Sequence, residues 1–191
     1  MKKNKKPLSN VLALSFIILI VLIFYYLGRS QKADNLKEAS LEKLSEVQQV
    51  LAIDFDKEYP KTPRDVAKLH GDMTRLLYSG LEDEEVKDLA MKIRELCDEE
   101  FLSSNPEEQY LNNLYTDLSL WKELDRKVDV VIVVNEDKEE TKVVDGVEHA
   151  TAYILFTIIE KGKTSELRQY IMRKNENGKW KILGWEYIPQ G

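Results

Sequence analysis

Residues 170–188 read YIMRKNENGKWKILGWEYI and predict the hairpin from which the rest of the fold can be worked out. Asn175-Glu176-Asn177-Gly178 is a polar turn sequence, and its Asn-Gly pair favours the positive φ angles of a tight hairpin turn. The flanking segments, 166–174 and 179–188, carry aromatic and large apolar side chains, which are typical of strands. Gly184 lies inside the second of these strands and predicts a bulge that bends it.

Two further strands are predicted before this hairpin. Residues 128–134 read VDVVIVV, a segment too short and too β-branched for a helix. Residues 149–160 read HATAYILFTIIE and are apolar at odd and even positions alike, so we expect a central strand that is covered on both faces. Between these strands, residues 135–142 are a charged turn, and Val143-Val144 predict the start of a short strand that Asp145-Gly146 interrupts.

Helical patterns occupy the chain before these strands. Apolar residues recur every three or four positions over 63–79, 83–101 and 106–124, which predicts three amphipathic helices. Thr62, Pro63 and Asp65 form a helix start of N-cap, proline and capping-box acid, and Asn105-Pro106 predicts another. A looser stripe over 34–54 predicts a helical stalk. Helices followed by a meander of strands indicate an α+β fold, with about three helices packed on one face of a curved antiparallel sheet of about four strands.

Residues 8–27 read LSNVLALSFIILIVLIFYYL and predict a membrane-spanning helix. About 20 apolar residues at the helical rise cross a hydrocarbon core of roughly 30 Å. The flank Gly28-Arg29-Ser30 lacks the small-residue pattern of a cleavage site, which favours an uncleaved signal anchor over a removed signal peptide. The predicted organisation is therefore a basic stub (1–7), a transmembrane anchor (8–27), a helical stalk (28–55) and an α+β domain (56–191).

The charges around the anchor predict its orientation. Four lysines and no acid precede it, whereas basic and acidic residues alternate after it. Because basic residues stay on the cytoplasmic side, we expect a single-pass protein of the cell membrane with a cytoplasmic N-terminus and an extracytoplasmic domain. Tyr25 and Tyr26 suit the outer interface, where aromatic rings gather.

Composition excludes several classes of function. The net charge is −6, and without the four N-terminal lysines 24 basic residues stand against 34 acidic ones, which argues against a nucleic-acid partner. Cys97 is the lone cysteine, so no intrachain disulfide can form. The only histidines, His70 and His149, lie far apart and give no zinc-ligand spacing. We therefore expect neither a metal nor a cofactor.

Three features together resemble known proteins: the helix start EYPKTPRDVAKLH, the acidic start of the next helix and the ending RKNENGKWKILGW. They resemble the nuclear transport factor 2-like (cystatin-like) fold over roughly residues 55–188. They also resemble an uncharacterised family of single-span Gram-positive bacterial proteins whose outer domain has this fold. The resemblance implies a cone-shaped domain with a cavity between helices and sheet. It implies no catalytic residue, because this fold hosts isomerases, dehydratases, secretion subunits and binding domains alike.

Four residues are candidates for ligand binding in such a cavity: Asp129, Tyr153, Arg168 and Tyr170. Asp129 is an acid inside an apolar strand, where a cavity would raise its pKa, although exposure near the strand start is the simpler account. The tyrosines belong to a strip of aromatic residues that could line a pocket, but cross-strand packing is the simpler explanation. No arrangement of acid, base and nucleophile is recognisable, and no catalytic residue is assigned.

These observations predict a non-enzymatic, membrane-anchored, extracytoplasmic binding or scaffold domain. Its expected partners are the membrane and either another envelope protein or further copies of the chain. Two alternatives stay open. One is a small-ligand binder or an isomerase- or dehydratase-like enzyme that uses the cone cavity, and the other is an accessory subunit of a secretion or conjugation channel.

Overall fold

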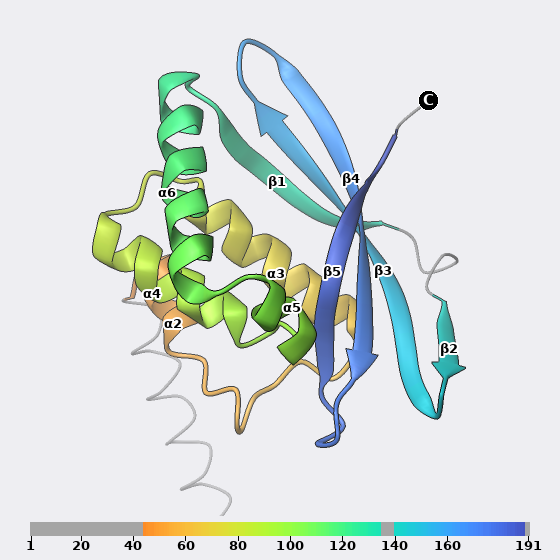
Figure 1. Cartoon of the computed structure of the whole chain (residues 1–191). Coiled ribbons are helices and arrows are strands. Elements are labelled where there is room, and N and C mark those ends of the chain that lie inside the picture. The colour runs from red at the N-terminus through yellow and green to blue at the C-terminus, as the bar shows by residue number, and fades with distance from the viewer. Residues whose placement is uncertain (1–43, 135–139, 190–191) are drawn as a thin grey trace, which may run out of the picture. The chain divides into compact units, whose positions relative to one another are not determined.

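Helices packed on one face of an antiparallel sheet make up the part of the chain that the computed structural model describes, residues 44–134 and 140–189 (Figure 1). From Glu46 onward this part forms one compact unit. The predicted stub, the predicted anchor (8–27) and residues 34–43 of the predicted stalk helix lie outside the described residues. Within the described residues, no helix is both long enough and apolar enough to cross a bilayer.

The elements follow the predicted order, with helices first and strands afterwards. The helices are α2 (Glu46–Leu51), α3 (Pro63–Leu77), α4 (Asp83–Arg94), α5 (Glu99–Ser104) and α6 (Glu107–Glu123). The strands are β1 (Lys127–Val134), β2 (Thr141–Val144), β3 (Val147–Ile159), β4 (Lys163–Lys174) and β5 (Trp180–Ile188). The strand order is β1-β3-β4-β5, and β2 pairs with the N-terminal end of β3. The α+β prediction is therefore confirmed.

The sheet differs from the prediction of about four strands because β2 is a fifth strand. Asp145 (φ 50°) and Gly146 (φ 81°) form a two-residue turn that folds β2 onto β3, rather than only interrupting a strand. β3 consequently begins at Val147, two residues before the predicted start. The predicted turn at 175–178 is confirmed: the Gly178 N–H donates to the Asn175 carbonyl, and Gly178 has φ 72°.

The predicted helix over 83–101 is wrong at its C-terminal end. α4 stops at Arg94 because the chain next pairs with strand β5, where Ile182 donates to the Leu96 carbonyl and the Asp98 N–H donates to the Ile182 carbonyl. The Asp98 carboxylate then accepts from the Glu100 N–H and caps α5. Asn105, predicted as the cap of the last helix, instead ends α5, and the N-cap position of α6 is Pro106.

The core lies between α3 and the sheet, and Gly71 sets the distance between them. A Cβ atom at Gly71 would lie 2.7 Å from Val131 Cγ1 and 3.3 Å from Ile154 Cγ2. The absence of a side chain therefore lets the middle of α3 rest directly on β1 and β3. Thr62 caps this helix as predicted, because its hydroxyl accepts from the Asp65 N–H at 3.1 Å.

We expect Gly71→Ala to destabilise the domain by up to about 2 kcal/mol. The gain in helix propensity, about 1 kcal/mol, is smaller than the cost of overpacking, typically about 1–3 kcal/mol. Urea unfolding of the full chain in detergent measures the change. Gly184→Ala is the matched control, since a Cβ there meets nothing within 4 Å. Equal stability of the two variants would contradict the close-contact account.

Candidate functional site

The four predicted ligand-binding residues lie on different parts of the sheet. Tyr170 pairs with Ala152, and Arg168 pairs with Ile154, so both point to the face that the helices cover. Tyr153 pairs with Gln169, so it points to the opposite face. Asp129 lies at a bulge near the start of β1 and forms an ion pair with Lys163 at 3.2 Å. The structure therefore brings Arg168 and Tyr170 together and separates them from the other two.

Tyr170 belongs to a ring cluster between the helices and the sheet. Its hydroxyl lies 3.0 Å from His70 Nδ1, and the His70 ring packs against Tyr170 and Trp185 with ring centres 5.2 and 5.0 Å apart. Phe101 of α5 covers Trp185 at 5.5 Å. His70 and Tyr170 are buried, so these side chains fill the interior at the place where the resemblance implied a cavity.

Burial dictates the protonation of the ring cluster. Loss of hydration, together with the nearby charge of Arg168, lowers the pKa of His70 to about 3. Burial also raises the pKa of the Tyr170 hydroxyl, which stays protonated at neutral pH. Both groups are therefore neutral at pH 7, and their hydrogen bond holds α3 against β4.

Arg168 stacks its guanidinium on the Phe156 ring at 4.3 Å and lies 5.3 Å from the Tyr187 ring centre. It also forms an ion pair with Glu166 at 2.6 Å. Its charge is thus neutralised by its own strand, and its plane is covered by aromatic rings. This arrangement positions Arg168 as part of the packing at the edge of the ring cluster.

A polar groove of about 920 Å³ lies at the opposite end of the sheet from the β3–β4 turn. We call it the basal groove. It is formed by the segment before α3, the α4–α5 connection, and the β2–β3 and β4–β5 turns. Its lining residues include Phe55, Asp56, Tyr59, Arg94, Glu95, Asp98, Asp145, His149, Arg173, Lys179 and Lys181. Such a volume is typical of small-molecule sites. The chemistry of the groove depends on whether its charged groups are already partnered.

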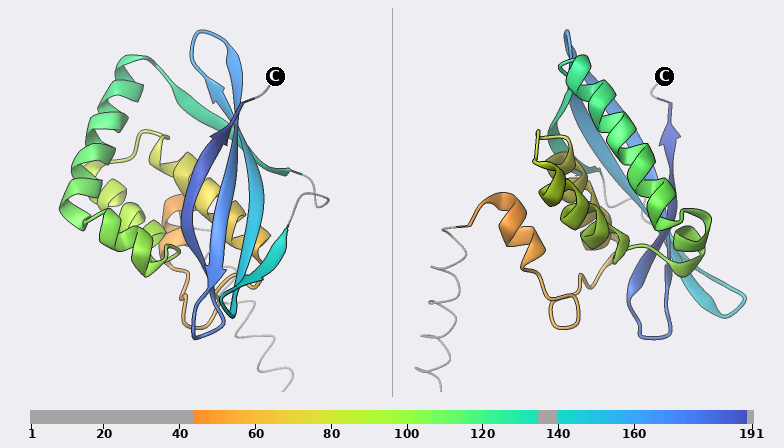
Figure 2. Two further views of the ribbon diagram at one scale, coloured as in Figure 1. Left: turned by 45° about the vertical axis from the view of Figure 1, so that its right-hand side comes forward. Right: turned by 60° about the vertical axis from the view of Figure 1, so that its left-hand side comes forward.

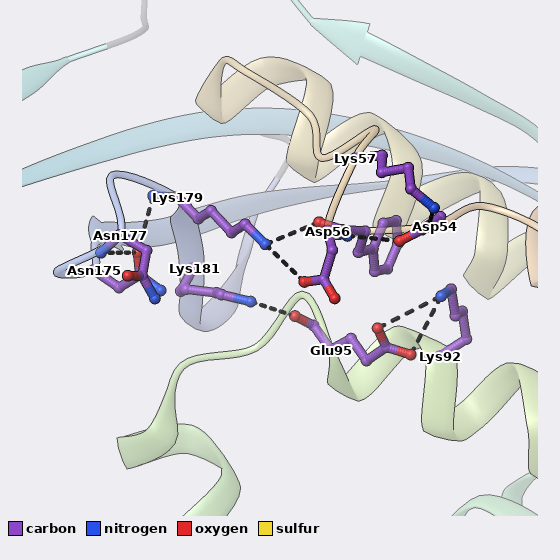
Figure 3. A network of polar contacts seen from close by, with 10 residues as sticks. Asp54, Asp56, Lys57, Lys92, Glu95, Asn175, Asn177, Lys179 and Lys181 are labelled. Atoms are coloured by element: carbon purple, nitrogen blue, oxygen red, sulfur yellow. Dashed lines mark hydrogen bonds and ion pairs between the residues drawn. The ribbon is translucent and has the colours of Figure 1, made fainter.

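The lysines of the basal groove are partnered within the chain (Figure 3). Lys179 Nζ donates to the Phe55 carbonyl at 2.9 Å and lies 3.5 Å from Asp56, while Lys181 Nζ donates to the Glu95 carbonyl at 2.5 Å. Both ammonium groups lie about 5 Å from the centre of the Tyr59 ring. Burial, followed by repulsion from Lys179, lowers the pKa of Lys181. Lys179 therefore joins the β4–β5 hairpin to the segment before α3, and Lys181 joins it to the C-terminal end of α4.

Asp98 is the most buried acid of the basal groove. Its two carboxylate oxygens accept from Arg173 Nη2 at 2.6 Å and Nε at 2.9 Å, a bidentate pair, and Arg173 also reaches Glu100 at 3.2 Å. Since Asp98 also caps α5, one side chain joins helix α5 to strand β4. Sequence reasoning missed this residue, although the run Asp98-Glu99-Glu100 has the pattern of an N-cap followed by acids.

A second surface is the sheet face opposite the helices, which we call the open sheet face (Figures 1 and 2). The strand register aligns Ile132, Leu155, Leu167 and Ile188 in one row across β1, β3, β4 and β5. Neighbouring residues on this face include Val130, Tyr153 and Ile171. Leu167 is buried yet lies outside the core cluster, as expected for a residue on the far side of the sheet.

The open sheet face corrects one prediction. β3 is central, but helices from the described residues cover only one of its faces (Figure 2). The apolar residues at both odd and even positions of 149–160 were the signal for this second apolar face. In the described part of the chain, no cluster of three or more histidine, cysteine, aspartate or glutamate side chains could hold a metal ion.

We expect Asp98→Ala to lower the free energy of unfolding by about 3 kcal/mol. About 1 kcal/mol comes from the lost helix cap and the remainder from charge-assisted hydrogen bonds to Arg173. Asp98→Asn keeps the cap and should lose only about 2 kcal/mol. Urea unfolding measures both changes. Asp129→Ala is the control, because Asp129 belongs to an exposed ion pair, and we expect it to change the free energy of unfolding by less than about 1 kcal/mol. Identical losses in the Ala and Asn variants would contradict the capping role.

We expect His70 to remain neutral in the folded protein at pH 5. In His149→Gln, His70 is the sole histidine, so its imidazole can be followed by NMR without assignment. The unfolded chain takes up a proton on the His70 imidazole near pH 6.5, whereas the folded chain does so only near pH 3. The free energy of unfolding therefore has its full value above pH 6.5. It then falls by about 1.4 kcal/mol per pH unit as the pH drops through this window. An imidazole that titrates above pH 6 in the folded state would contradict its burial.

Comparisons with known proteins identify a family and five matching chains of solved structures. No curated protein sequence matches the chain. The crystal structure of CagV from Helicobacter pylori strain 26695, described as a VirB8 homolog of the T4SS, is similar with a TM-score of 0.40 and 11% identity, over 66% of this chain and 98% of the CagV chain. The family described as "Domain of unknown function (DUF6715)" matches residues 1–185. This match includes both the predicted anchor and nearly all of the folded domain, and the chain therefore belongs to the DUF6715 family.

Proposed function

We propose that this protein is a membrane-anchored, extracytoplasmic binding or scaffold protein that acts through its surface and catalyses no reaction. The anchor is the uncharged segment 8–27, preceded by four lysines, and the working part is the α+β domain. Assembly with other envelope proteins, including those of a secretion or conjugation channel, would be one form of this role.

The observation that carries the proposal is the contrast between the two faces of the sheet. On the helix-covered face, His70, Tyr170 and Trp185 pack against one another and fill the interior. On the open sheet face, an apolar row crosses four strands without a helix from the described residues above it. Apolar surface that is gathered into one patch marks an interaction site.

A second candidate function is the binding of a small anionic ligand in the basal groove. It is favoured by the volume of about 920 Å³ and by the basic side chains of Arg173, Lys179 and Lys181 in the lining. We rank it second because Lys179, Lys181 and Arg173 each have a partner within the chain, which a ligand would have to displace. The predicted enzyme alternative ranks lower, since Tyr153 and Arg168 point to opposite faces of the sheet.

Topology is tested by cysteine labelling of the full chain in bacterial protoplasts. We expect a membrane-impermeant maleimide to label Leu120→Cys from outside, because this residue is half exposed on α6, and to label Lys2→Cys only after lysis. The wild-type chain is the control, since its single cysteine, Cys97, is buried. Labelling of Lys2→Cys in intact protoplasts, or protection of Leu120→Cys, would contradict the proposed orientation.

A further inference from the structure

We infer that the open sheet face is a homodimer interface, in which the apolar row of one copy packs on the same row of a second copy. This inference rests on the proposed function, because it names the partner of a protein that acts through its surface.

The first argument is the apolar character of the row itself. Ile132 is 48% exposed and Ile171 is 38% exposed, and both project from the sheet face opposite the helices of the described residues. Leu155 and Leu167 continue the row from Ile132 on the central strands, where Leu155 is half-buried and Leu167 is buried, and Ile171 lies on β4 two rows away. Strands that are apolar on both faces belong to sheets that are covered on both faces. A second layer is therefore expected over this face.

The second argument is charge. The chain has a net charge of −6, so two copies repel each other unless they meet through a face without like charges. The row Ile132, Leu155, Leu167 and Ile188 contains no charge. Asp129, at one end of the face, is already paired with Lys163 at 3.2 Å. Glu186 lies opposite Gln169 on the edge strand β5, in the row between the apolar row and Ile171.

The third argument is self-complementarity. A two-fold axis that runs along the row places each apolar residue of one copy over the row of the other, as an isologous interface requires. Two sheets that pack face to face through such residues lie about 10 Å apart, a common arrangement in β proteins. Anchoring both copies in the same membrane would raise their effective concentration and favour this contact.

Other occupants from the same chain fit less well. If 8–27 lies in the bilayer, residues 28–43 offer only two leucines, Leu36 and Leu41, among many charged residues. Residues 135–139 read NEDKE and are charged. Neither of these segments supplies an uncharged apolar row, whereas a second copy does.

The test is co-purification of two full-length copies that carry different N-terminal tags and are co-expressed in one bacterial membrane. The membranes are dissolved in mild detergent, one tag is captured, and the amount of the second tag is measured. Ile132→Glu and Ile171→Glu, each present in both copies, place two carboxylates in the proposed interface. We expect each to lower the captured second copy at least tenfold.

Leu120→Glu is the matched control, because Leu120 is 50% exposed, almost as Ile132 is, but lies on α6 and not on the sheet. It should leave co-purification at the wild-type level. Circular dichroism and urea unfolding of each variant test whether the domain is still folded. Two independent sheet variants are used so that the test remains valid if one of them misfolds.

Co-purification that is unchanged by both sheet variants, or lowered equally by Leu120→Glu, would overturn the inference. So would a wild-type chain that captures no second copy. If the sheet variants instead release a different envelope protein from a monomeric chain, the second-copy inference fails while the proposed binding function stands. Cysteine labelling tests the proposed topology independently of either result.

Discussion

The close contact between helix α3 and the sheet at Gly71 is the constraint on which the rest of the domain depends. With no side chain at this position, the helix backbone rests on Val131 and Ile154, and the side chains on either side of the contact are directed into the core. His70, the preceding residue, consequently reaches the Tyr170 hydroxyl, while Thr74 donates to the His70 carbonyl one turn later. A single close approach therefore determines both the separation of the two layers and the position of the buried polar groups.

At the basal end of the domain, polar contacts hold the segments together, whereas apolar packing does so near Gly71. Asp98 joins α5 to β4 through Arg173, and Tyr59 donates to the Trp180 carbonyl at 2.6 Å, which joins the segment before α3 to β5. Lys179 and Lys181 complete these links by donating to the carbonyls of Phe55 and Glu95. Because each cation satisfies a carbonyl or a carboxylate of a distant segment, the groove is a structural joint whose charges are mostly balanced within the chain.

The sheet face opposite the helices differs from both of these regions. Among the described residues, the interior holds neutral, hydrogen-bonded rings, and the basal groove holds charges that are partnered within the chain. The open sheet face differs from both, because its row from Ile132 to Ile188 is apolar and lacks a helix above it among the described residues. This uncharged row is the feature on which the proposed binding role rests.

The sequence by itself determined the features whose causes are local: the Asn175–Gly178 turn, the Thr62 cap, the bulge beside Gly184 and the order of helices before strands. It also contained the apolar pattern of β3, without indicating what covers each face. Only the tertiary structure decided where α4 ends, because that end depends on pairing between Leu96 and Ile182, 86 residues apart. It also decided that Arg168 and Tyr170 meet while Tyr153 and Asp129 do not, since strand register fixes the face to which each side chain points. Turns and caps are set by neighbouring residues, whereas register and layer contacts are set by residues that meet only after the chain has folded.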